Sequence, residues 1–141
     1  GAVEHLTHLR SELACPFGEH HERLTTVEHL AAGAQRLAIE HADRTGDLPT
    51  LRYALDESTF TLVREGRFEA AAMILGNGDS GEISRWNMPW DATGIEESEQ
   101  QILAELGDEA CDAARARGLA MTQREIVAFT LNELRALDTH V

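Results

Sequence analysis

Histidine and cysteine side chains, which bind borderline metals such as zinc, gather in the first part of the chain. They are His5, His8, Cys15, His20, His21 and His29. None of the recognised zinc-ligand spacings is present among them, and His8 could meet His20 only if the segment between them folded back. We therefore expect solvent-exposed histidines in this part of the chain and no metal site.

Carboxylates are dense over residues 96–112, where paired acidic residues on helices could hold magnesium. The seven are Glu96, Glu97, Glu99, Glu105, Asp108, Glu109 and Asp112, and they faintly resemble the paired acidic motifs of helical nucleotide pyrophosphohydrolases. Gly107 separates the two halves of the pattern, however, and carboxylates near helix starts have a simpler role in complementing the helix dipole. We expect no magnesium site here.

Residues of the types used in nucleophilic catalysis are scattered along the chain. No serine stands in a nucleophile elbow or in a recognisable triad with histidine and aspartate. No lysine occurs at all, which removes Schiff-base and lysine general-base chemistry. The glycine-rich residues 76–81 lack the lysine and the spacing of a phosphate-binding loop. We expect a protein that is not an enzyme, with no catalytic and no cofactor-binding residues.

The charge of the chain bounds its partners. Its 141 residues carry 25 acids and 12 bases, a formal net charge of −13, whereas a nucleic-acid-binding domain needs a basic face to displace counterions from phosphates. No apolar run approaches the roughly 20 residues of a membrane span, and two cysteines cannot form a disulfide framework. The sequence therefore predicts a cytoplasmic protein with no direct nucleic-acid partner and no membrane partner.

Apolar residues recur every three to four positions over most of the chain, which predicts helices. The helical segments are residues 3–14, 24–41, 67–75, 95–106, 109–117 and 126–137. In the second of these, the expected buried stripe includes Ala34, Leu37 and Ala38. With aromatic residues at only 5%, the core must depend on leucine, alanine and isoleucine. We expect one all-α domain, residues 1–141, of six or seven helices in antiparallel hairpins.

Glycines mark the expected turns between these helices, because glycine adopts the left-handed backbone of a tight turn without a Cβ clash. They are Gly46, Gly66, Gly107 and Gly118. Thr122 and Glu125 form the Thr-x-x-Glu pattern of a capping box, which predicts the start of the last helix. Residues 48–65 leave two alternatives open, since their leucines fit a helix while residues 59–63 alternate like a strand.

The longest irregular stretch spans residues 76–94 and contains both tryptophans of the chain, Trp86 and Trp90. We expect these rings to cover one end of the helical stack. The alternative is that they are exposed anchors for a protein partner, because tryptophan is enriched at binding hot spots.

Two stretches resemble known helical repeats. At residues 64–75 a glycine, an aromatic residue and an alanine match the turn of a tetratricopeptide repeat; they are Gly66, Phe68 and Ala71. In such a turn the aromatic ring wedges between helices, and the small residues let the backbones approach. Residues 96–131 resemble the end of the helical-repeat region in large actinobacterial MalT-like, LuxR-type and AfsR-type transcriptional regulators. The matching parts are Gly107, an alanine-rich helix up to Gly118, the Thr122 cap and an apolar last helix.

This resemblance implies a non-catalytic, tetratricopeptide-like helical-repeat module that belongs to a longer regulator. It implies a role in interaction or sensing, in which the module binds a protein segment or a small effector, or restrains neighbouring domains. Any nucleotide-binding or DNA-reading activity of such a regulator is expected outside this chain. The alternative is a free-standing acidic α+β inhibitor of the immunity or antitoxin type, with a hairpin at residues 59–75.

Overall fold

The computed structural model describes residues 17–81, 83–87 and 93–138, and for residues 17–30, 93 and 138 it describes the helical backbone alone. These residues form α2 (Phe17–Thr45), α3 (Leu48–Arg64), α4 (Phe68–Asn77), the 3-10 turn η1 (Arg85–Asn87), α5 (Thr93–Leu106), α6 (Asp108–Leu119) and α7 (Gln123–Asp138). The described part of the chain contains no strand. The all-α prediction is therefore confirmed, whereas the predicted helix at residues 3–14 lies outside the described residues.

The segment that left two alternatives open is helical, so the predicted alternative of a hairpin at residues 59–75 is wrong. Its helix α3 buries Leu51, Leu55 and Leu62 on one face. The hydroxyl of Ser58 donates to the carbonyl oxygen of Ala54, and the hydroxyl of Thr59 donates to the carbonyl oxygen of Asp56. Such bonds satisfy buried hydroxyl groups within a helix. The polar residues that alternate over 59–63 can therefore be buried in a helix, and their alternation does not indicate a strand.

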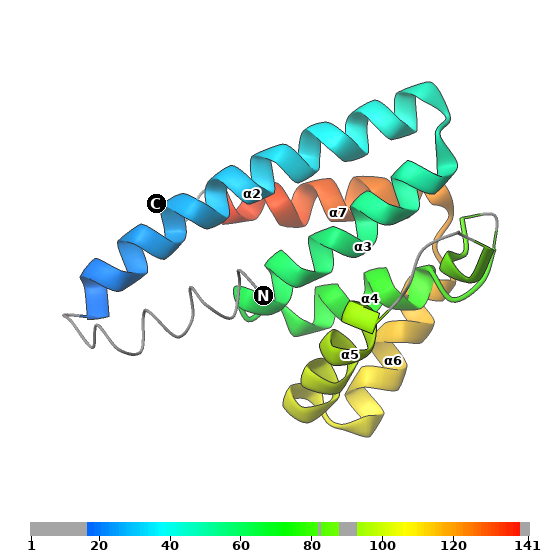
Figure 1. The fold of residues 1–141 in the computed structure, drawn as a ribbon. Helices are drawn as coiled ribbons and strands as arrows, with labels where there is room; N and C mark the ends of the chain where they lie inside the picture. The colour runs from blue at the N-terminus through cyan, green and yellow to red at the C-terminus, as the bar shows by residue number, and fades with distance from the viewer. Residues whose placement is uncertain (1–16, 82, 88–92, 139–141) are drawn as a thin grey trace.

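The helices are arranged in two groups that meet at α3 and α4 (Figure 1). In the first group, α2 packs against both α3 and α7. In the second group, α4 packs mainly on α6, and α5 lies against α4 and α6. Since α4 also packs on α3, it joins the two groups into a single core.

The core consists mainly of aliphatic side chains, as the low aromatic content predicts. Its largest wholly buried members are Leu51, Leu55, Leu62, Ile74, Leu75, Ile39, Ile102, Ile126 and Leu134. Alanines also belong to the core, among them the wholly buried Ala71, Ala72 and Ala114. Small side chains let helix backbones come near each other while the larger aliphatic groups supply the buried apolar area.

The predicted turns and caps between helices are confirmed at four places. Gly46, Gly66 and Gly107 adopt left-handed backbone conformations with φ of 72°, 77° and 84°. At the start of α7, the amide of Glu125 donates to Oγ1 of Thr122 at 3.1 Å, and the amide of Thr122 donates to Oε1 of Glu125 at 2.9 Å. These reciprocal bonds are the capping box that the sequence predicts.

Two glycines do not mark turns. Gly76 lies inside α4 and Gly118 inside α6, so the predicted irregular stretch starts two residues too early and the predicted end of α6 is wrong. A Cβ atom on Gly118 would overlap the carbonyl oxygen of Met73, and one on Gly76 would overlap the backbone of Arg115. Both glycines therefore lie where α4 and α6 are in contact. A glycine is needed at these positions because the helices pack too closely for a side chain, and not because the chain turns there.

The predicted buried stripe of α2 lies partly on the wrong face. Ala34, Leu37 and Ala38 are exposed, Leu37 by 69%, whereas Ala32 and Ile39 are wholly buried. Apolar residues occur on both of these faces, so periodicity alone could not select between them. The choice is made by α3 and α7, which pack against α2 from the side of Ile39.

Candidate interaction site

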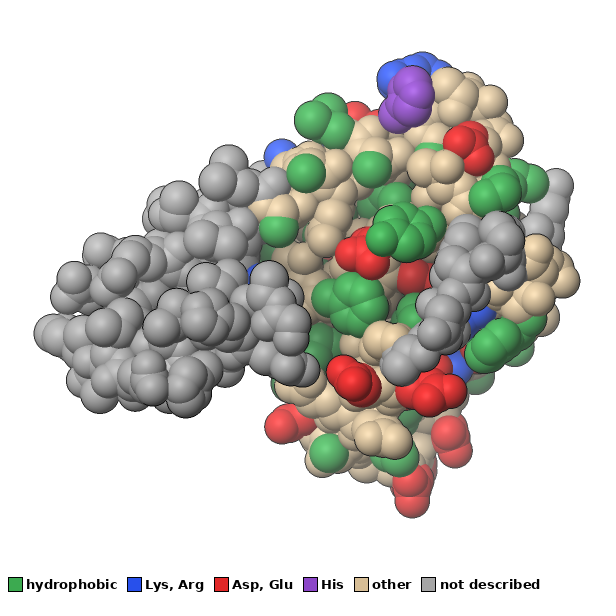
Figure 2. Space-filling view, viewed as in Figure 1, with side chains coloured by type: hydrophobic (Ala, Val, Ile, Leu, Met, Phe, Trp, Pro, Cys, Tyr) green, Lys and Arg blue, Asp and Glu red, His purple; other side chains and the backbone are tan. Residues whose placement is uncertain are grey.

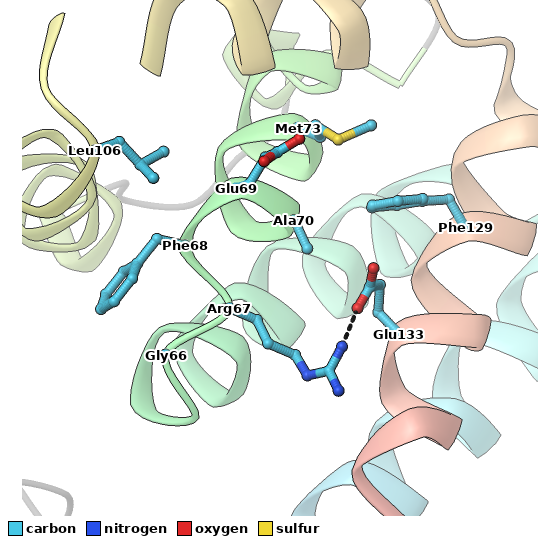
Figure 3. A pocket seen from close by; sticks show the side chains of 9 residues that line it. All are labelled: Gly66, Arg67, Phe68, Glu69, Ala70, Met73, Leu106, Phe129 and Glu133. Carbon is cyan, nitrogen blue, oxygen red and sulfur yellow. Dashed lines mark hydrogen bonds and ion pairs between the residues drawn. The ribbon is translucent and has the colours of Figure 1, made fainter. Parts of the chain in front are cut away.

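A groove lies beside the Gly66 turn, between the start of α4, the end of α5 and α7 (Figure 3). Its volume is about 380 Å³. The residues that line it are Gly66, Arg67, Phe68, Glu69, Ala70, Met73, Leu106, Phe129 and Glu133. We call it the α4–α7 groove.

The floor of the groove is apolar because two helices each turn one face towards it. Ala70 and Met73 are three residues apart on α4, and Phe129 and Glu133 are four apart on α7, so each pair shares a helix face. Ala70 and Met73 are each 7% exposed, while Phe129 is half-buried. In Figure 3 the ring of Phe129 points across the groove towards α4. The groove thus presents an apolar floor on which the ring of Phe129 is partly exposed.

Charged residues stand at the edge of this floor. Nη1 of Arg67 donates to Oε2 of Glu133 at 2.7 Å, which joins the start of α4 to α7 (Figure 3). Both side chains keep about a quarter of their surface exposed, 28% for Arg67 and 23% for Glu133. Glu69 is paired with Arg117 of α6 at the other side. The Arg117–Glu69 pair is exposed, and exposed ion pairs add little stability, whereas the Arg67–Glu133 pair is partly buried.

A second groove lies on another face of α7. Its volume is about 460 Å³, and it is lined by Asp43 of α2 and by Gln123, Arg124, Val127, Ala128 and Leu131 of α7. We call it the α2–α7 groove. Leu131 is two positions from Phe129, which turns the two side chains about 200° apart around the helix. Single substitutions in α7 can therefore address one groove at a time.

A buried ion cluster, which sequence reasoning missed, lies between α3 and η1. The side chains of Arg52 and Arg85 are wholly buried, and both bind Asp56. Arg52 approaches Oδ1 of Asp56 through Nη2 at 2.9 Å. Arg85 binds the carboxylate with two atoms, Nη2 to Oδ1 at 2.8 Å and Nε to Oδ2 at 3.1 Å. In the sequence, Arg52 and Asp56 have the spacing of an ordinary surface pair on a helix, so burial was not predictable from them.

The cluster extends to α4 and α6 and leaves no reactive group open. Arg52 also donates to Oδ1 of Asn77 at 3.1 Å, and Arg85 to Oδ1 of Asp79 at 3.0 Å. Asp79 in turn accepts from Arg115 of α6 at 2.6 Å. Burial lowers the pKa of the Arg52 guanidinium, and Asp56 opposes that shift. Because the charges bind one another, this cluster holds elements together and offers no ligand a free charge.

The structure brings only two of the predicted packing residues into the α4–α7 groove, Gly66 and Phe68. Ala71 is wholly buried in the core. Gly46, Gly107, Gly118 and Thr122 lie at separate turns and contacts, and they form no common site with these.

The expectation that the tryptophans cover one end of the helical stack is wrong for Trp86, which is 64% exposed. This exposure is what the alternative of an exposed anchor for a partner requires. Its neighbour Arg85 points inward to Asp56 instead, and this fixes η1 with the indole ring outward. Trp90, the other predicted partner-binding residue, lies outside the described residues.

Metal binding and thiol reactivity were two further kinds of chemistry to look for among the described side chains. No three His, Cys, Asp or Glu side chains there are placed to hold a metal ion. The histidines and the cysteine of the predicted cluster at residues 5–29 lie outside that part. Burial raises the pKa of the Cys111 thiol, so it is held in the protonated, weakly nucleophilic form.

None of the helices described is long and apolar enough to cross a membrane.

Comparisons with known proteins identified no relative of this chain. No protein-family model matches the chain, and neither a curated protein nor a solved structure matches it significantly.

Proposed function

We propose that this chain is a non-catalytic, tetratricopeptide-like interaction module of a bacterial transcriptional regulator, and that its α4–α7 groove binds a segment of protein. The observation that carries the proposal is the open groove of about 380 Å³ with a floor of Ala70, Met73 and Phe129. Helical modules commonly bind the apolar face of a peptide helix in such a groove.

The lining favours a protein segment over a small effector. Pockets for small molecules combine apolar walls with several polar groups that converge on the ligand. In the α4–α7 groove the polar side chains are Arg67, Glu69 and Glu133, and each of them is engaged in an ion pair. Met73 supplies a flexible, polarizable surface, which suits peptide side chains of varied shape.

The tetratricopeptide-like part of the proposal is supported by the Gly66 turn. Gly66 has the left-handed conformation that the turn requires, Ala71 is buried where α4 approaches its neighbours, and Phe68 packs against the core. The long stretch between α4 and α5 departs from a regular repeat. We therefore assign the module to the irregular end of a helical array, where it contacts a partner or restrains a neighbouring domain in the cytoplasm.

The proposal is tested with a peptide of about 18 residues that forms an amphipathic helix, with leucines on one face and glutamines elsewhere. Fluorescence anisotropy of the labelled peptide measures binding to the purified chain. Phe129→Ala should weaken binding about tenfold or more, because the ring forms part of the floor. Leu131→Ala is the matched control, since it is also half-buried on α7 but lines the α2–α7 groove.

Two results would contradict the proposal. One is the absence of saturable binding to the unmodified chain at peptide concentrations up to the millimolar range. The other is an equal loss of affinity in the Phe129→Ala and Leu131→Ala variants, which would place the contact elsewhere. Circular dichroism of both variants shows whether they keep the helical fold.

A further inference from the structure

We infer that the partner segment is a basic amphipathic helix, and that one of its Lys or Arg side chains binds Glu133 in place of Arg67. This inference rests on the proposed function and adds the chemistry of the occupant. It is carried by the rim of the α4–α7 groove, where charges of one sign outnumber the other.

Acidic side chains surround the groove in excess. Five acids line the groove or lie within two residues of a lining residue in the sequence, against three bases by the same measure. The acids are Glu65, Glu69, Glu105, Asp108 and Glu133, and the bases are Arg64, Arg67 and Arg135. Figure 2 shows acidic side chains gathered at the end of the molecule formed by α5 and α6. A basic segment would meet a complementary potential there, whereas an acidic one would be repelled.

Glu133 is the carboxylate best placed to bind a base of the partner. It follows Phe129 by one helical turn on α7, so a helix whose apolar face covers Phe129 brings its flanking side chains to Glu133. Its present partner, Arg67, is held at 2.7 Å but is only partly buried. Because Arg67 sits at the turn before α4 and keeps access to solvent, it can release the carboxylate and become hydrated.

A second copy of this chain is the less favoured occupant. Each copy carries a formal net charge of −13, so two copies repel each other as they approach. No basic helix is present among the described elements to place against the acidic rim. α2 carries its bases mixed with acids, as in Arg36, Glu40, Asp43 and Arg44.

The test compares three peptides of about 18 residues that share one leucine face. Their remaining positions carry lysine, glutamine or glutamate. At moderate salt, the lysine peptide should bind about tenfold or more tightly than the glutamine peptide, and the glutamate peptide more weakly than either. The advantage of the lysine peptide should shrink as salt is raised, because exposed charges are screened.

Two substitutions locate the charge contact. Glu133→Gln should weaken the lysine peptide about threefold or more while leaving the glutamine peptide unchanged. Glu97→Gln is the matched control: it removes the same charge from an exposed position on α5 that does not line the groove. Equal losses in both variants would reduce the effect to net charge and overturn the assignment of Glu133.

The outcomes separate this inference from the proposed function. If the glutamine and lysine peptides bind equally, the inference is overturned and the interaction module stands. If no peptide binds, both fall. If lysine-peptide binding survives Phe129→Ala unchanged, the peptide is adsorbed by charge alone and the inference is overturned. Light scattering that shows a dimer dissociated by Phe129→Ala would replace the basic helix with a second copy.

Discussion

Gly118 of α6 lies directly against the carbonyl oxygen of Met73 of α4, so that a Cβ atom at residue 118 would overlap it. Gly76 of α4 lies in the same way against the backbone of Arg115. The two helices therefore cross with their backbones in contact, and each provides a glycine at the crossing. Met73 also lines the α4–α7 groove, so this crossing positions one residue of its floor.

Gly118→Ala should destabilise the fold by about 1–3 kcal/mol or more, because α6 must move away from α4 to admit the methyl group. Gly33→Ala is the control. Gly33 lies within helix α2, and a Cβ atom there would meet no atom within 4 Å. Alanine at that position should be neutral or stabilise by up to about 1 kcal/mol through its higher helix propensity. Urea denaturation followed by circular dichroism measures both, and equal effects would contradict the close crossing.

Removal of the shared carboxylate from the buried ion cluster should be severe. Asp56→Ala leaves the wholly buried guanidinium groups of Arg52 and Arg85 without their common anion, at a cost of about 3–5 kcal/mol. Arg117→Ala breaks the exposed pair with Glu69 and should cost less than about 1 kcal/mol. Chemical denaturation compares the two variants. A loss at Asp56 as small as that at Arg117 would show that the cluster is hydrated in solution.

Substitutions at two residues of α4 that follow the Gly66 turn should lower the free energy of unfolding by different amounts. Ala71 is wholly buried, so Ala71→Leu should cost about 1–3 kcal/mol by overpacking. Phe68 is half-buried and packs against the core, so Phe68→Ala should cost less than the roughly 3–5 kcal/mol of a wholly buried ring. Thermal unfolding of the two variants checks both values, and a neutral result at Ala71 would contradict the observed packing of α4.

Two helix caps should make stability fall in acid. Hydrogen bonds from Thr50 lower the pKa of Asp47, and hydrogen bonds from Thr122 lower the pKa of Glu125. Because the folded-state pKa lies below the unfolded one, each carboxylate stabilises the fold above its unfolded pKa. That contribution is lost as the pH falls through the folded pKa, below about pH 4.

The double variant Asp47→Asn and Glu125→Gln keeps groups that can accept the capping hydrogen bonds but cannot titrate. Its melting temperature should fall less between pH 6 and pH 3, on the order of these acid pKa values, than that of the unmodified chain. Glu97→Gln, at an exposed position on α5, is the control for the loss of a carboxylate. If the double variant is as acid-sensitive as the unmodified chain, the caps do not carry the effect.

The sequence predicted correctly the parts of the fold that depend only on residues close by in the chain. The Gly46 and Gly66 turns and the Thr122 cap were predictable because φ preference and capping are decided within about one helical turn. The α4–α7 groove was predictable only in part: the Gly66 turn resembles a repeat, but Phe129 and Glu133 reach it from α7 through tertiary packing. Position in a sequence does not reveal which distant helix will cover a residue.

The features that were missed share this dependence on distant contacts. Leu37 belongs to a helical stripe yet is exposed, because α3 and α7 pack on the opposite side of α2. Arg52 looks like half of a surface pair with Asp56, but it is buried because α4 covers it. Asn77 and the carbonyl oxygen of Ile74 accept hydrogen bonds from its guanidinium. Gly118 has the sequence pattern of a helix end. Its actual role, a contact with the backbone of Met73, depends on a helix that is distant in sequence.

The bond between Arg85 and Asp56 should affect hydrogen exchange in η1. Irregular segments usually open locally, with free energies far below that of global unfolding. Here the amide of Arg85 donates to the carbonyl oxygen of Gly78 at 2.9 Å, and its side chain is bound to Asp56 in α3. Opening this segment breaks the buried cluster, so the Arg85 amide should exchange as slowly as the amides of α3. We therefore expect η1 to unfold together with the core, so that the indole of Trp86 is presented by a turn that opens only when the whole domain does.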